Sequence, residues 1–329
     1  MNARRLSRRT VLQQAVALGC AGALAGSALA GDPAATLVAS PKPGRLAAEA
    51  GTLVIGGDLK VVRLGLGAMR ITGDGIWGEP RDAGEARALL RRAVELGVNF
   101  IDTADAYGPS VSERLIAEAL HPYPRHLVIA TKGGLVRPSR PEWQPDGRPE
   151  HLREACEASL RRLKLERIDL YQFHRPDPKV PFADSVGALK DLQQAGKIRH
   201  IGLSNIDIDQ LHQAQSIIKV ASVQNRYNVA DRASEPVLKA CERERIAFLP
   251  WGPLAQRAQE SATPDAALTA LTAIAAARHV AVPTAALAWL LAKSPVMLPI
   301  PGTSRIDHLE EDLGAARLRL SAAEMRRIA

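Results

Sequence analysis

Residues 64–70 read Leu-Gly-Leu-Gly-Ala-Met-Arg, and they decide between two α/β folds for this chain. A short apolar run followed by Gly-x-Gly can open the phosphate-binding turn of a doubly wound sheet. That turn has the pattern G-x-G-x-x-G and leads straight into a helix. Here Arg70 stands where the third glycine is required, and helix signals begin only near Pro80. The segment therefore favours the first strand of a closed barrel.

Around this segment, short apolar runs alternate with stretches of helical period. Parallel strands need long crossovers, so eight such runs with helices between them predict a (β/α)8 TIM barrel, an α/β fold. Upstream, Thr52–Ile55 and Lys60–Arg63 flank a Gly-Gly-Asp-Leu turn and predict an N-terminal β-hairpin. The predicted barrel strands are Leu64–Gly67, Asn99–Asp102, Leu127–Thr131, Ile168–Gln172, His200–Leu203, Ser222–Gln224, Ala247–Pro250 and Leu298–Pro301. The clearest predicted helices are Asp82–Leu96, Ser112–Leu120, Glu150–Leu163, Phe182–Gln194 and Thr284–Ala292.

Composition agrees with one large barrel domain. The chain has 329 residues and is 46% hydrophobic, which is ample for a single core. Four arginines within residues 1–30 account for half of the formal net charge of +8, so the remainder is too mildly basic to indicate nucleic-acid binding. The three cysteines have no metal-ligand spacing; Cys20 lies near the N-terminus, and Cys156 and Cys241 are expected to be buried free thiols.

The first thirty residues have the pattern of a secretory leader. A basic segment containing Ser7-Arg8-Arg9-Thr10-Val11-Leu12-Gln13 precedes an uncharged Ala/Gly-rich run that ends in Ala28-Leu29-Ala30. The paired arginines resemble the twin-arginine (Tat) signal of bacteria, which implies contact with the Tat export machinery and a periplasmic mature protein. Residues 1–30 are therefore predicted to be a signal peptide, 31–50 a Pro-containing linker and 51–329 the barrel domain.

Two other interpretations of the leader stay open. It could remain uncleaved as a membrane anchor, although Ala and Gly make it poorly apolar for a stable span. It could also carry a lipoprotein-type attachment at Leu18-Gly19-Cys20.

Polar residues stand where the predicted strands end, and in a barrel the active site lies at the C-terminal ends of the strands. All of them are expected to face one mouth of the barrel. They are Asp102 with Tyr107 five residues on, Lys132, His174, Ser204 with Asn205, Gln224 with Asn225, and Trp251.

Four of these side chains could together assist the reduction of a carbonyl group by a nicotinamide, which supplies the hydride and needs a proton donor and a stabiliser of the developing alkoxide. A tyrosine such as Tyr107 can act as general acid if a nearby cation lowers its pKa, which is about 10 when free. Lys132 is the expected cation, Asp102 would hold it in place, and a neutral His174 could donate a hydrogen bond to the substrate oxygen. Each residue alone is commonly structural, but their combination at successive strand ends is not.

A metal-dependent hydrolase on the same fold would need His/Asp ligand pairs at strand ends, which are not found, so no metal is expected.

Residues 99–108, Asn-Phe-Ile-Asp-Thr-Ala-Asp-Ala-Tyr-Gly, resemble the aldo-keto reductase signature around its catalytic aspartate and tyrosine. Ala130-Thr131-Lys132 is similar to the family's lysine segment, and Leu170-Tyr171-Gln172-Phe173-His174 to its histidine segment. The resemblance spans about residues 53–320. It implies a (β/α)8 barrel that transfers hydride between NADP(H) and a small-molecule aldehyde or ketone. A cofactor-binding, redox-sensing or auxiliary subunit with little turnover is the alternative function.

The same resemblance implies a set of cofactor residues. Ser204, Asn205 and Gln224 would hold the nicotinamide carboxamide, Trp251 would stack on its ring, and Gly252 and Leu254 belong to the loop over the pyrophosphate. Two positions depart from the family pattern, His308 for a frequent Arg and Asp312 for a frequent Asn. Binding of the 2′-phosphate is therefore expected to depend mainly on Arg305, Thr303 and Ser304. The residues implied at the 2′-phosphate and adenine site are Gly302, Thr303, Ser304, Arg305, His308, Glu311 and Asp312.

Substrate residues are less well marked. Residues 67–70 and 75–82, with Gln-Asn-Arg-Tyr-Asn at 224–228, look like the branch of the family that contains bacterial pyridoxal reductases. Trp77, and Trp143 in the loop Gly133–Pro149, are expected to form pocket walls, with loop packing as the alternative role for both.

Overall fold

The computed structural model of the chain describes residues 46–254 and 265–329. The predicted signal peptide, with Cys20, lies outside the described residues. The final residues of the predicted linker are described: Ala47–Ala50 form a short 3-10 helix, and Leu46 and Ala47 are buried in the core. The packed part of the chain thus includes a few residues before Gly51.

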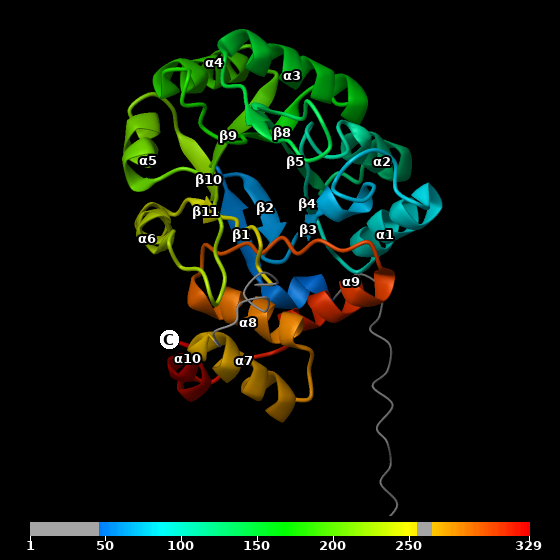
Figure 1. Cartoon of the computed structure of the whole chain (residues 1–329), viewed down its shortest axis with the longest axis vertical. Helices are drawn as coiled ribbons and strands as arrows, with labels where there is room; N and C mark the ends of the chain where they lie inside the picture. Colours follow the sequence, from blue (N-terminus) through cyan, green and yellow to red (C-terminus); the bar gives the residue numbers. More distant parts are fainter. Residues whose placement is uncertain (1–45, 255–264) are drawn as a thin grey trace, which may run out of the picture. The chain divides into compact units, whose positions relative to one another are not determined.

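Seven parallel strands form a single curved sheet in the order β11-β10-β9-β8-β5-β4-β3. Figure 1 shows them as a ring with the helices outside it. The strands of this sheet are β3 (Leu66–Gly67), β4 (Phe100–Asp102), β5 (Val128–Gly133), β8 (Ile168–Phe173), β9 (Ile198–Ser204), β10 (Val220–Gln224) and β11 (Ala247–Phe248).

Backbone hydrogen bonds from residues 296–301 close the ring. On one side Leu298 N donates to Phe248 O of β11 at 2.9 Å. On the other side Gly65 N donates to Pro299 O at 3.0 Å, and Gly67 N donates to Pro301 O at 2.8 Å. This segment is the predicted eighth strand, so the (β/α)8 barrel is confirmed.

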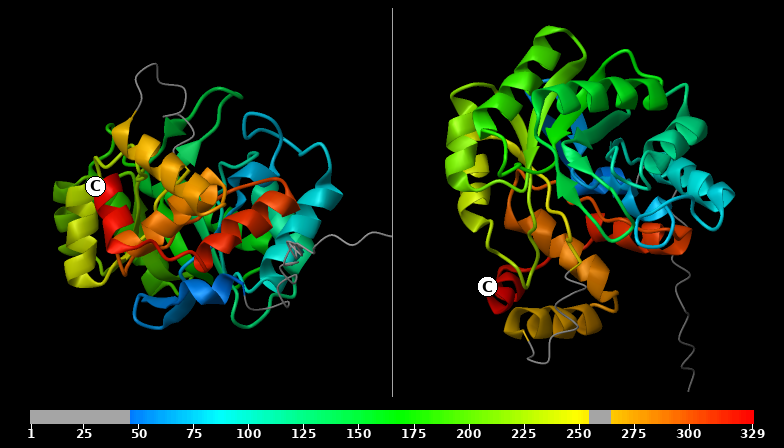
Figure 2. Two further views of the ribbon diagram at one scale, coloured as in Figure 1. Left: turned by 90° about the horizontal axis from the view of Figure 1, so that it is seen from below. Right: turned by 45° about the horizontal axis from the view of Figure 1, so that its top comes forward.

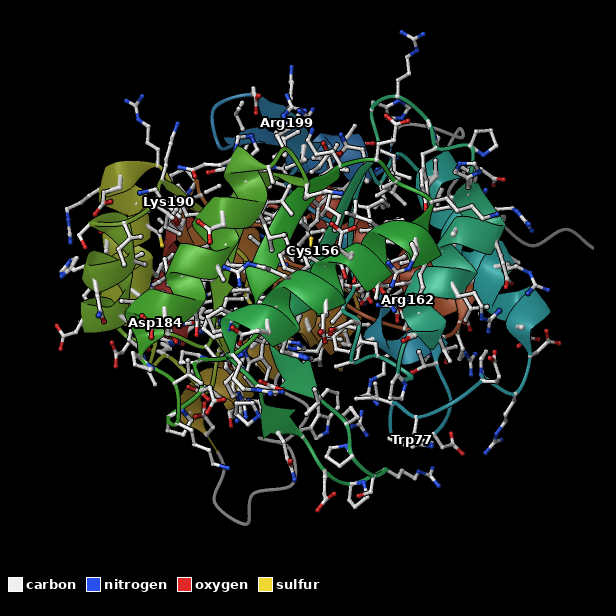
Figure 3. All side chains as sticks on the ribbon, turned by 90° about the horizontal axis from the view of Figure 1, so that it is seen from above. Trp77, Cys156, Arg162, Asp184, Lys190 and Arg199 are labelled. Carbon is white, nitrogen blue, oxygen red and sulfur yellow. The ribbon has the colours of Figure 1, made fainter. Side chains whose placement is uncertain are left out.

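An antiparallel hairpin of β1 (Thr52–Ile55) and β2 (Leu59–Val62) covers one end of the barrel, as predicted. Its residues Ile55, Leu59 and Val61 belong to the same apolar cluster as Phe100 and Leu170 from the barrel strands. This cluster fills the barrel interior from the hairpin end. Figure 3 labels Arg199 at the hairpin end and Trp77 at the opposite end, where the polar strand-end residues lie.

Helices connect the strands and pack their apolar faces on the outside of the ring. Local signals explain where several begin: Asp82 accepts from Gly84 N and Glu85 N at the start of α1, and Pro149 occupies the first turn of α3. Figure 2 shows the last four helices, in gold to red, gathered on one side of the barrel. The helices are α1 (Ala83–Glu95), α2 (Val111–Leu120), α3 (Pro149–Leu163), α4 (Phe182–Gln194), α5 (Ile208–Gln215), α6 (Glu235–Glu244), α7 (Ala266–Ala277), α8 (Val282–Lys293), α9 (Ile306–Leu313) and α10 (Ala322–Ile328).

One feature at the polar end was not predicted. Within the loop that follows β5, a small antiparallel pair forms from β6 (Leu135–Val136) and β7 (Gln144–Pro145).

Elsewhere Cys156 and Cys241 are buried free thiols, as expected. Among the described helices none is long and apolar enough on its own to span a membrane; α7 and α8 pass that test only as a pair, bent by 110°.

Candidate active site

A buried ion pair lies at the centre of the polar end of the barrel. Asp102 is the last residue of β4, and Lys132 comes from the neighbouring strand β5. Lys132 Nζ donates to Asp102 Oδ2 at 2.6 Å and to Thr103 O at 2.8 Å. The lysine is fully buried and the aspartate is 2% exposed, so the pair is desolvated as well as close.

The hydroxyl of Tyr107 lies next to this pair. Lys132 Nζ is 3.3 Å from Tyr107 Oη, within reach of a hydrogen bond. The loop that carries Tyr107 turns sharply at Gly108, whose φ is +88°, and a Cβ there would lie 2.6 Å from Val111 Cβ. Glycine is required at that turn because an L side chain would be strained and would clash.

Electrostatics keep the tyrosine protonated and the lysine charged. Burial raises the pKa of Tyr107 above its ordinary value, and Lys132 offsets this only in part. Burial by itself would lower the pKa of Lys132, but Asp102 and Tyr107 together outweigh it and the pKa lies above its ordinary value. The expectation that Lys132 brings the pKa of Tyr107 below 10 is therefore wrong, because desolvation of the phenolate is the larger effect.

His174 follows β8 directly and faces Tyr107, with ring centroids 5.8 Å apart. Burial lowers its pKa well below the ordinary value, and Lys132 adds to the effect, so the imidazole is neutral. Its Nδ1 atom is buried and has no hydrogen-bond partner among the described residues.

Two glutamines complete the surroundings of Asp102. Gln172 Nε2 and Gln224 Nε2 both donate to Asp102 Oδ1, at 2.9 and 2.8 Å. The sequence predicts only a cofactor contact for Gln224 and no role for Gln172. Their position near the C-terminal ends of β8 and β10, the two strands that flank β9, was the available signal.

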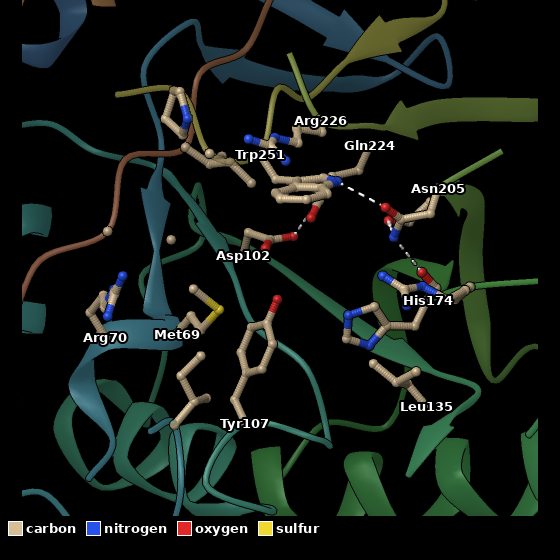
Figure 4. A pocket seen from close by; sticks show the side chains of 18 of the residues that line it. Met69, Arg70, Asp102, Tyr107, Leu135, His174, Asn205, Gln224, Arg226 and Trp251 are labelled. Carbon is tan, nitrogen blue, oxygen red and sulfur yellow. Dashed lines mark hydrogen bonds between the residues drawn. The ribbon is translucent and has the colours of Figure 1, made fainter. Parts of the chain in front are cut away.

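These residues line one pocket of about 520 Å³ at the polar end (Figure 4). Of the four residues predicted to be catalytic, Asp102, Tyr107 and His174 line it, whereas Lys132 is fully buried and does not. Of the residues predicted at the 2′-phosphate and adenine site, only Gly302 lines it. Trp143 lines the pocket, whereas Trp77 does not; Ile76 lines it instead. Its other lining residues include Met69, Arg70, Leu135, Arg175, Ser204, Asn205, Gln224, Arg226, Trp251, Gly252, Leu254 and Gly302.

The amide of Asn205 connects three walls of this pocket. Its Nδ2 donates to His174 O and to Ser204 Oγ, both at 3.0 Å, and its Oδ1 accepts from Trp251 Nε1 at 3.0 Å. Asn205 adopts a left-handed backbone with φ of +58°. The indole of Trp251 is thereby fixed with its ring against the pocket.

The predicted 2′-phosphate and adenine residues do not form one open site. Ser304, Arg305, His308 and Glu311 are exposed, but Arg305 is paired with Asp307, with Nε to Oδ1 at 3.0 Å. Thr303 accepts from Arg305 N, which organises the start of α9. Asp312 is only 5% exposed, and burial raises its pKa to about 7. Direct contact of Asp312 with a ligand is therefore not supported.

Sequence reasoning missed the cations of the pocket. Arg70, Arg175 and Arg226 all line it, and Arg226 is held by Asp231 at 3.0 Å. Each follows a predicted strand end or its first loop residues, which was the signal that could have identified them. Together they give the mouth of the pocket a positive charge.

Comparisons with known proteins agree with this geometry. The model of the Aldo/keto reductase family matches residues 63–329. An uncharacterized oxidoreductase of Schizosaccharomyces pombe (C215.11c) is 50% identical over 84% of this chain and 88% of its own length. Pyridoxine 4-dehydrogenase of Escherichia coli is 41% identical over 80% of this chain and 93% of its own. Among solved structures, an aldo-keto reductase of Klebsiella pneumoniae in complex with NADPH superposes with a TM-score of 0.69 at 26% identity, over 84% of this chain and 93% of that one.

Proposed function

The chain belongs to the aldo/keto reductase family, and we propose that it reduces an aldehyde or ketone to an alcohol with NADPH. The observation that carries this proposal is the buried contact of Lys132 with both Asp102 and the hydroxyl of Tyr107, facing a pocket large enough for a small carbonyl compound. Bound NADPH would supply the hydride. The remaining requirements of the reaction fall to side chains of this chain.

The pocket fits a nicotinamide ring. Trp251 offers a flat aromatic face whose orientation is fixed by its bond to Asn205. Gln224 uses its amide nitrogen on Asp102, which leaves its Oε1 as an acceptor for a carboxamide. Ser204 and Asn205 would lie on the same side, with Gly252, Leu254 and Gly302 toward the phosphates. The Klebsiella pneumoniae aldo-keto reductase was solved in complex with NADPH, which supports the same choice of cofactor here.

Tyr107 is positioned to give the proton. Its phenol is protonated at neutral pH, since a free tyrosine has a pKa of about 10 and burial raises the pKa of Tyr107 further. When the proton leaves toward the substrate oxygen, the phenolate would be stabilised by Lys132 at 3.3 Å. Asp102 keeps the ammonium in place at 2.6 Å, and the two glutamines hold the other carboxylate oxygen.

His174 would orient the substrate oxygen as a neutral donor. A proton on its Nδ1 would be buried with no acceptor among the described residues, which favours the tautomer protonated on Nε2. A charged imidazolium beside Lys132 is disfavoured by burial and by repulsion. The histidine therefore donates a hydrogen bond without supplying the proton that is transferred.

We propose a pyridoxal-type or similarly compact aromatic aldehyde as substrate. The name of the Escherichia coli relative and the local resemblance to pyridoxal reductases support this class. The wall of the pocket beside Tyr107 is apolar and partly aromatic, with Ile76, Leu135 and Trp143.

We also propose that residues 1–30 direct export of the folded barrel through the Tat machinery. The paired Arg8 and Arg9, the uncharged run and the Ala-Leu-Ala end support this location. A barrel that captures NADPH before export would enter the periplasm with its cofactor bound.

The proposed activity is tested on purified protein comprising residues 31–329. NADPH oxidation is followed with a panel of carbonyl compounds that includes pyridoxal and 4-nitrobenzaldehyde. Turnover with at least one aldehyde is expected. NADPH binding without turnover on any member would favour a cofactor-binding auxiliary subunit instead.

A further inference from the structure

The guanidinium of Arg137 is buried at the pocket rim without a carboxylate. Arg137 follows β6 and is 8% exposed, and no described carboxylate forms an ion pair with it. Its donors go to backbone carbonyl oxygens instead. Nε donates to Glu142 O at 2.8 Å, Nη1 donates to Ile76 O at 2.9 Å, and Nη2 donates to Gly75 O at 3.3 Å and also to Arg140 O. A buried cation with four carbonyl acceptors is a tightly specified arrangement.

These acceptors come from two separate loops. Gly75 and Ile76 belong to the loop after β3, here called the 73–78 loop, which is closed by Gly73 N donating to Gly78 O at 3.0 Å. The other two acceptors belong to the turn between β6 and β7, here called the 138–143 turn. About sixty residues separate the two segments in sequence, so Arg137 is a cross-link between them at the pocket mouth.

The 73–78 loop carries backbone strain at the point that Arg137 holds. Ile76 has a φ of +59°, a left-handed conformation that is a genuine outlier for a β-branched residue. Such conformations persist only where the surroundings impose them. The carbonyl of Ile76 accepts from Arg137, and its side chain lines the pocket.

Arg137 also fixes the aromatic part of the wall. Its guanidinium carbon lies 3.7 Å from the ring centroid of Trp143 and 5.4 Å from that of Trp77. Trp143 in turn packs edge-on to Tyr107, with ring centroids 6.4 Å apart. Of the two wall residues that Arg137 holds, Trp143 therefore lies beside the proposed acid, and Ile76 lines the same pocket.

We propose that Arg137 is a positioning residue that determines specificity: it clamps the 73–78 loop to the 138–143 turn and so limits the width of the carbonyl substrate. The limit on substrate width rests on the proposed function, whereas the link between the two loops does not. With the clamp intact, Ile76 and Trp143 press a narrow aldehyde toward Tyr107. Without it, Ile76 relaxes from its strained conformation and Trp143 loses the cation on its face, so the pocket widens.

The planar fork of arginine is needed for this role. A lysine carries the same charge but offers one point of donation, which cannot serve carbonyl groups on two loops at once. Arg140 provides a matched control on the same turn. It also donates to the 73–78 loop, through Nε and Nη2 to Asp74 O at 3.1 and 2.7 Å, but it is exposed and does not line the pocket.

The first test compares benzaldehyde with the wider 2-naphthaldehyde in wild type, Arg137→Ala, Arg137→Lys and Arg140→Ala. Arg137→Ala should raise KM for benzaldehyde about tenfold with little change in kcat, and shift the preference toward 2-naphthaldehyde by at least about tenfold. Arg137→Lys should recover little of this, and Arg140→Ala should keep the wild-type preference. NADPH affinity should stay within about twofold throughout. An unchanged preference in Arg137→Ala would overturn the specificity role even if the variant were less stable.

The second test is amide hydrogen exchange, which needs no turnover. In Arg137→Ala the amides of residues 73–78 and 142 should lose protection together, while those of the barrel strands stay protected; Arg140→Ala should leave residues 76–78 protected. Unchanged exchange of both loops would overturn the clamp. If wild type reduces no member of the carbonyl panel, the proposed function fails on its own, and the exchange result still decides whether Arg137 holds the two loops.

Discussion

Lys132 Nζ lies 2.6 Å from Asp102 Oδ2, and both side chains are almost wholly buried. A buried pair of this kind depends on both partners, since removing one leaves the other charge desolvated and unpaired. The two side chains therefore depend on each other for stability, and the pair keeps the charged ammonium of Lys132 beside the hydroxyl of Tyr107.

Replacing the lysine tests this dependence. Lys132→Met should lower the free energy of unfolding by about 3–5 kcal/mol, because Asp102 is left without its cation, and should also reduce turnover. The double variant Lys132→Met/Asp102→Asn should regain part of the stability but none of the activity. Urea denaturation and NADPH oxidation measure the two effects. Equal stability of the single and double variants would show that the unpaired carboxylate of Asp102 is not the cause of the lost stability.

A second prediction concerns Asp105, which lies in the same loop as Tyr107. Its Oδ1 has no partner among the described residues, and burial, with Glu113 nearby, raises its pKa to about 8, although Arg162 and Lys132 oppose the shift. The folded state therefore binds this proton more tightly than the unfolded state. Stability should fall as the pH rises from about 4 to about 8, the interval between the unfolded and folded pKa values.

Asp105→Asn removes that loss. The variant should be more stable than wild type by roughly 2 kcal/mol or more at pH 8, and the advantage should shrink toward pH 4. Asp209→Asn, at an exposed position on α5, should show no such pH dependence. Thermal unfolding across pH is the measurement, and a pH-independent difference would mean that the carboxyl is not protonated in the folded protein.

Cofactor choice should depend on Arg305. Arg305→Ala should weaken NADPH relative to NADH by about 1.5–3 kcal/mol, the value of one charged hydrogen bond to the 2′-phosphate. Because Asp307 forms an ion pair with the guanidinium of Arg305, Asp307→Asn should increase the affinity for NADPH and leave the affinity for NADH unchanged. Fluorescence titration gives both affinities. Parallel changes for the two cofactors would place the discriminating group elsewhere.

The proposed export signal predicts a change of location. In a bacterial host with Tat machinery, the protein should be found in the periplasm, cut after Ala30 and carrying bound nicotinamide dinucleotide. Replacing Arg8 and Arg9 by lysine should retain the precursor in the cytoplasm. Fractionation with mass spectrometry of the N-terminus measures this. Wholly cytoplasmic, uncleaved wild-type protein would contradict the assignment, and cofactor-free periplasmic protein would contradict only the loading.

The barrel and the positions of the central site residues could be predicted because they follow from strand periodicity. Once Asp102, Lys132 and His174 are placed at strand ends, the geometry of parallel strands brings them together. The sign of the pKa shift of Tyr107 could not be predicted, because it depends on how much water the packed loops exclude. The role of Arg137 was hidden for a related reason: backbone carbonyl oxygens are its acceptors, and no sequence pattern marks them.

Loops and surface pairs account for the other differences. Trp77 was expected in the pocket wall, but a left-handed turn at Ile76 brings the isoleucine there instead. The sequence predicts Arg305 as the main cation for the 2′-phosphate but not its ion pair with Asp307, two residues on. Both outcomes depend on local backbone geometry that hydrophobic periodicity does not encode.

The central claim is that Tyr107 gives the proton to a carbonyl oxygen, and single-turnover reduction of 4-nitrobenzaldehyde by NADPH-loaded Tyr107→Phe tests it most directly. The variant keeps the ring that packs against Trp143 and His174 but lacks the hydroxyl beside Lys132. Reduction should slow by at least about 100-fold, the scale of a lost general acid, while NADPH affinity stays close to that of wild type. Near-normal reduction by the phenylalanine variant would contradict the account.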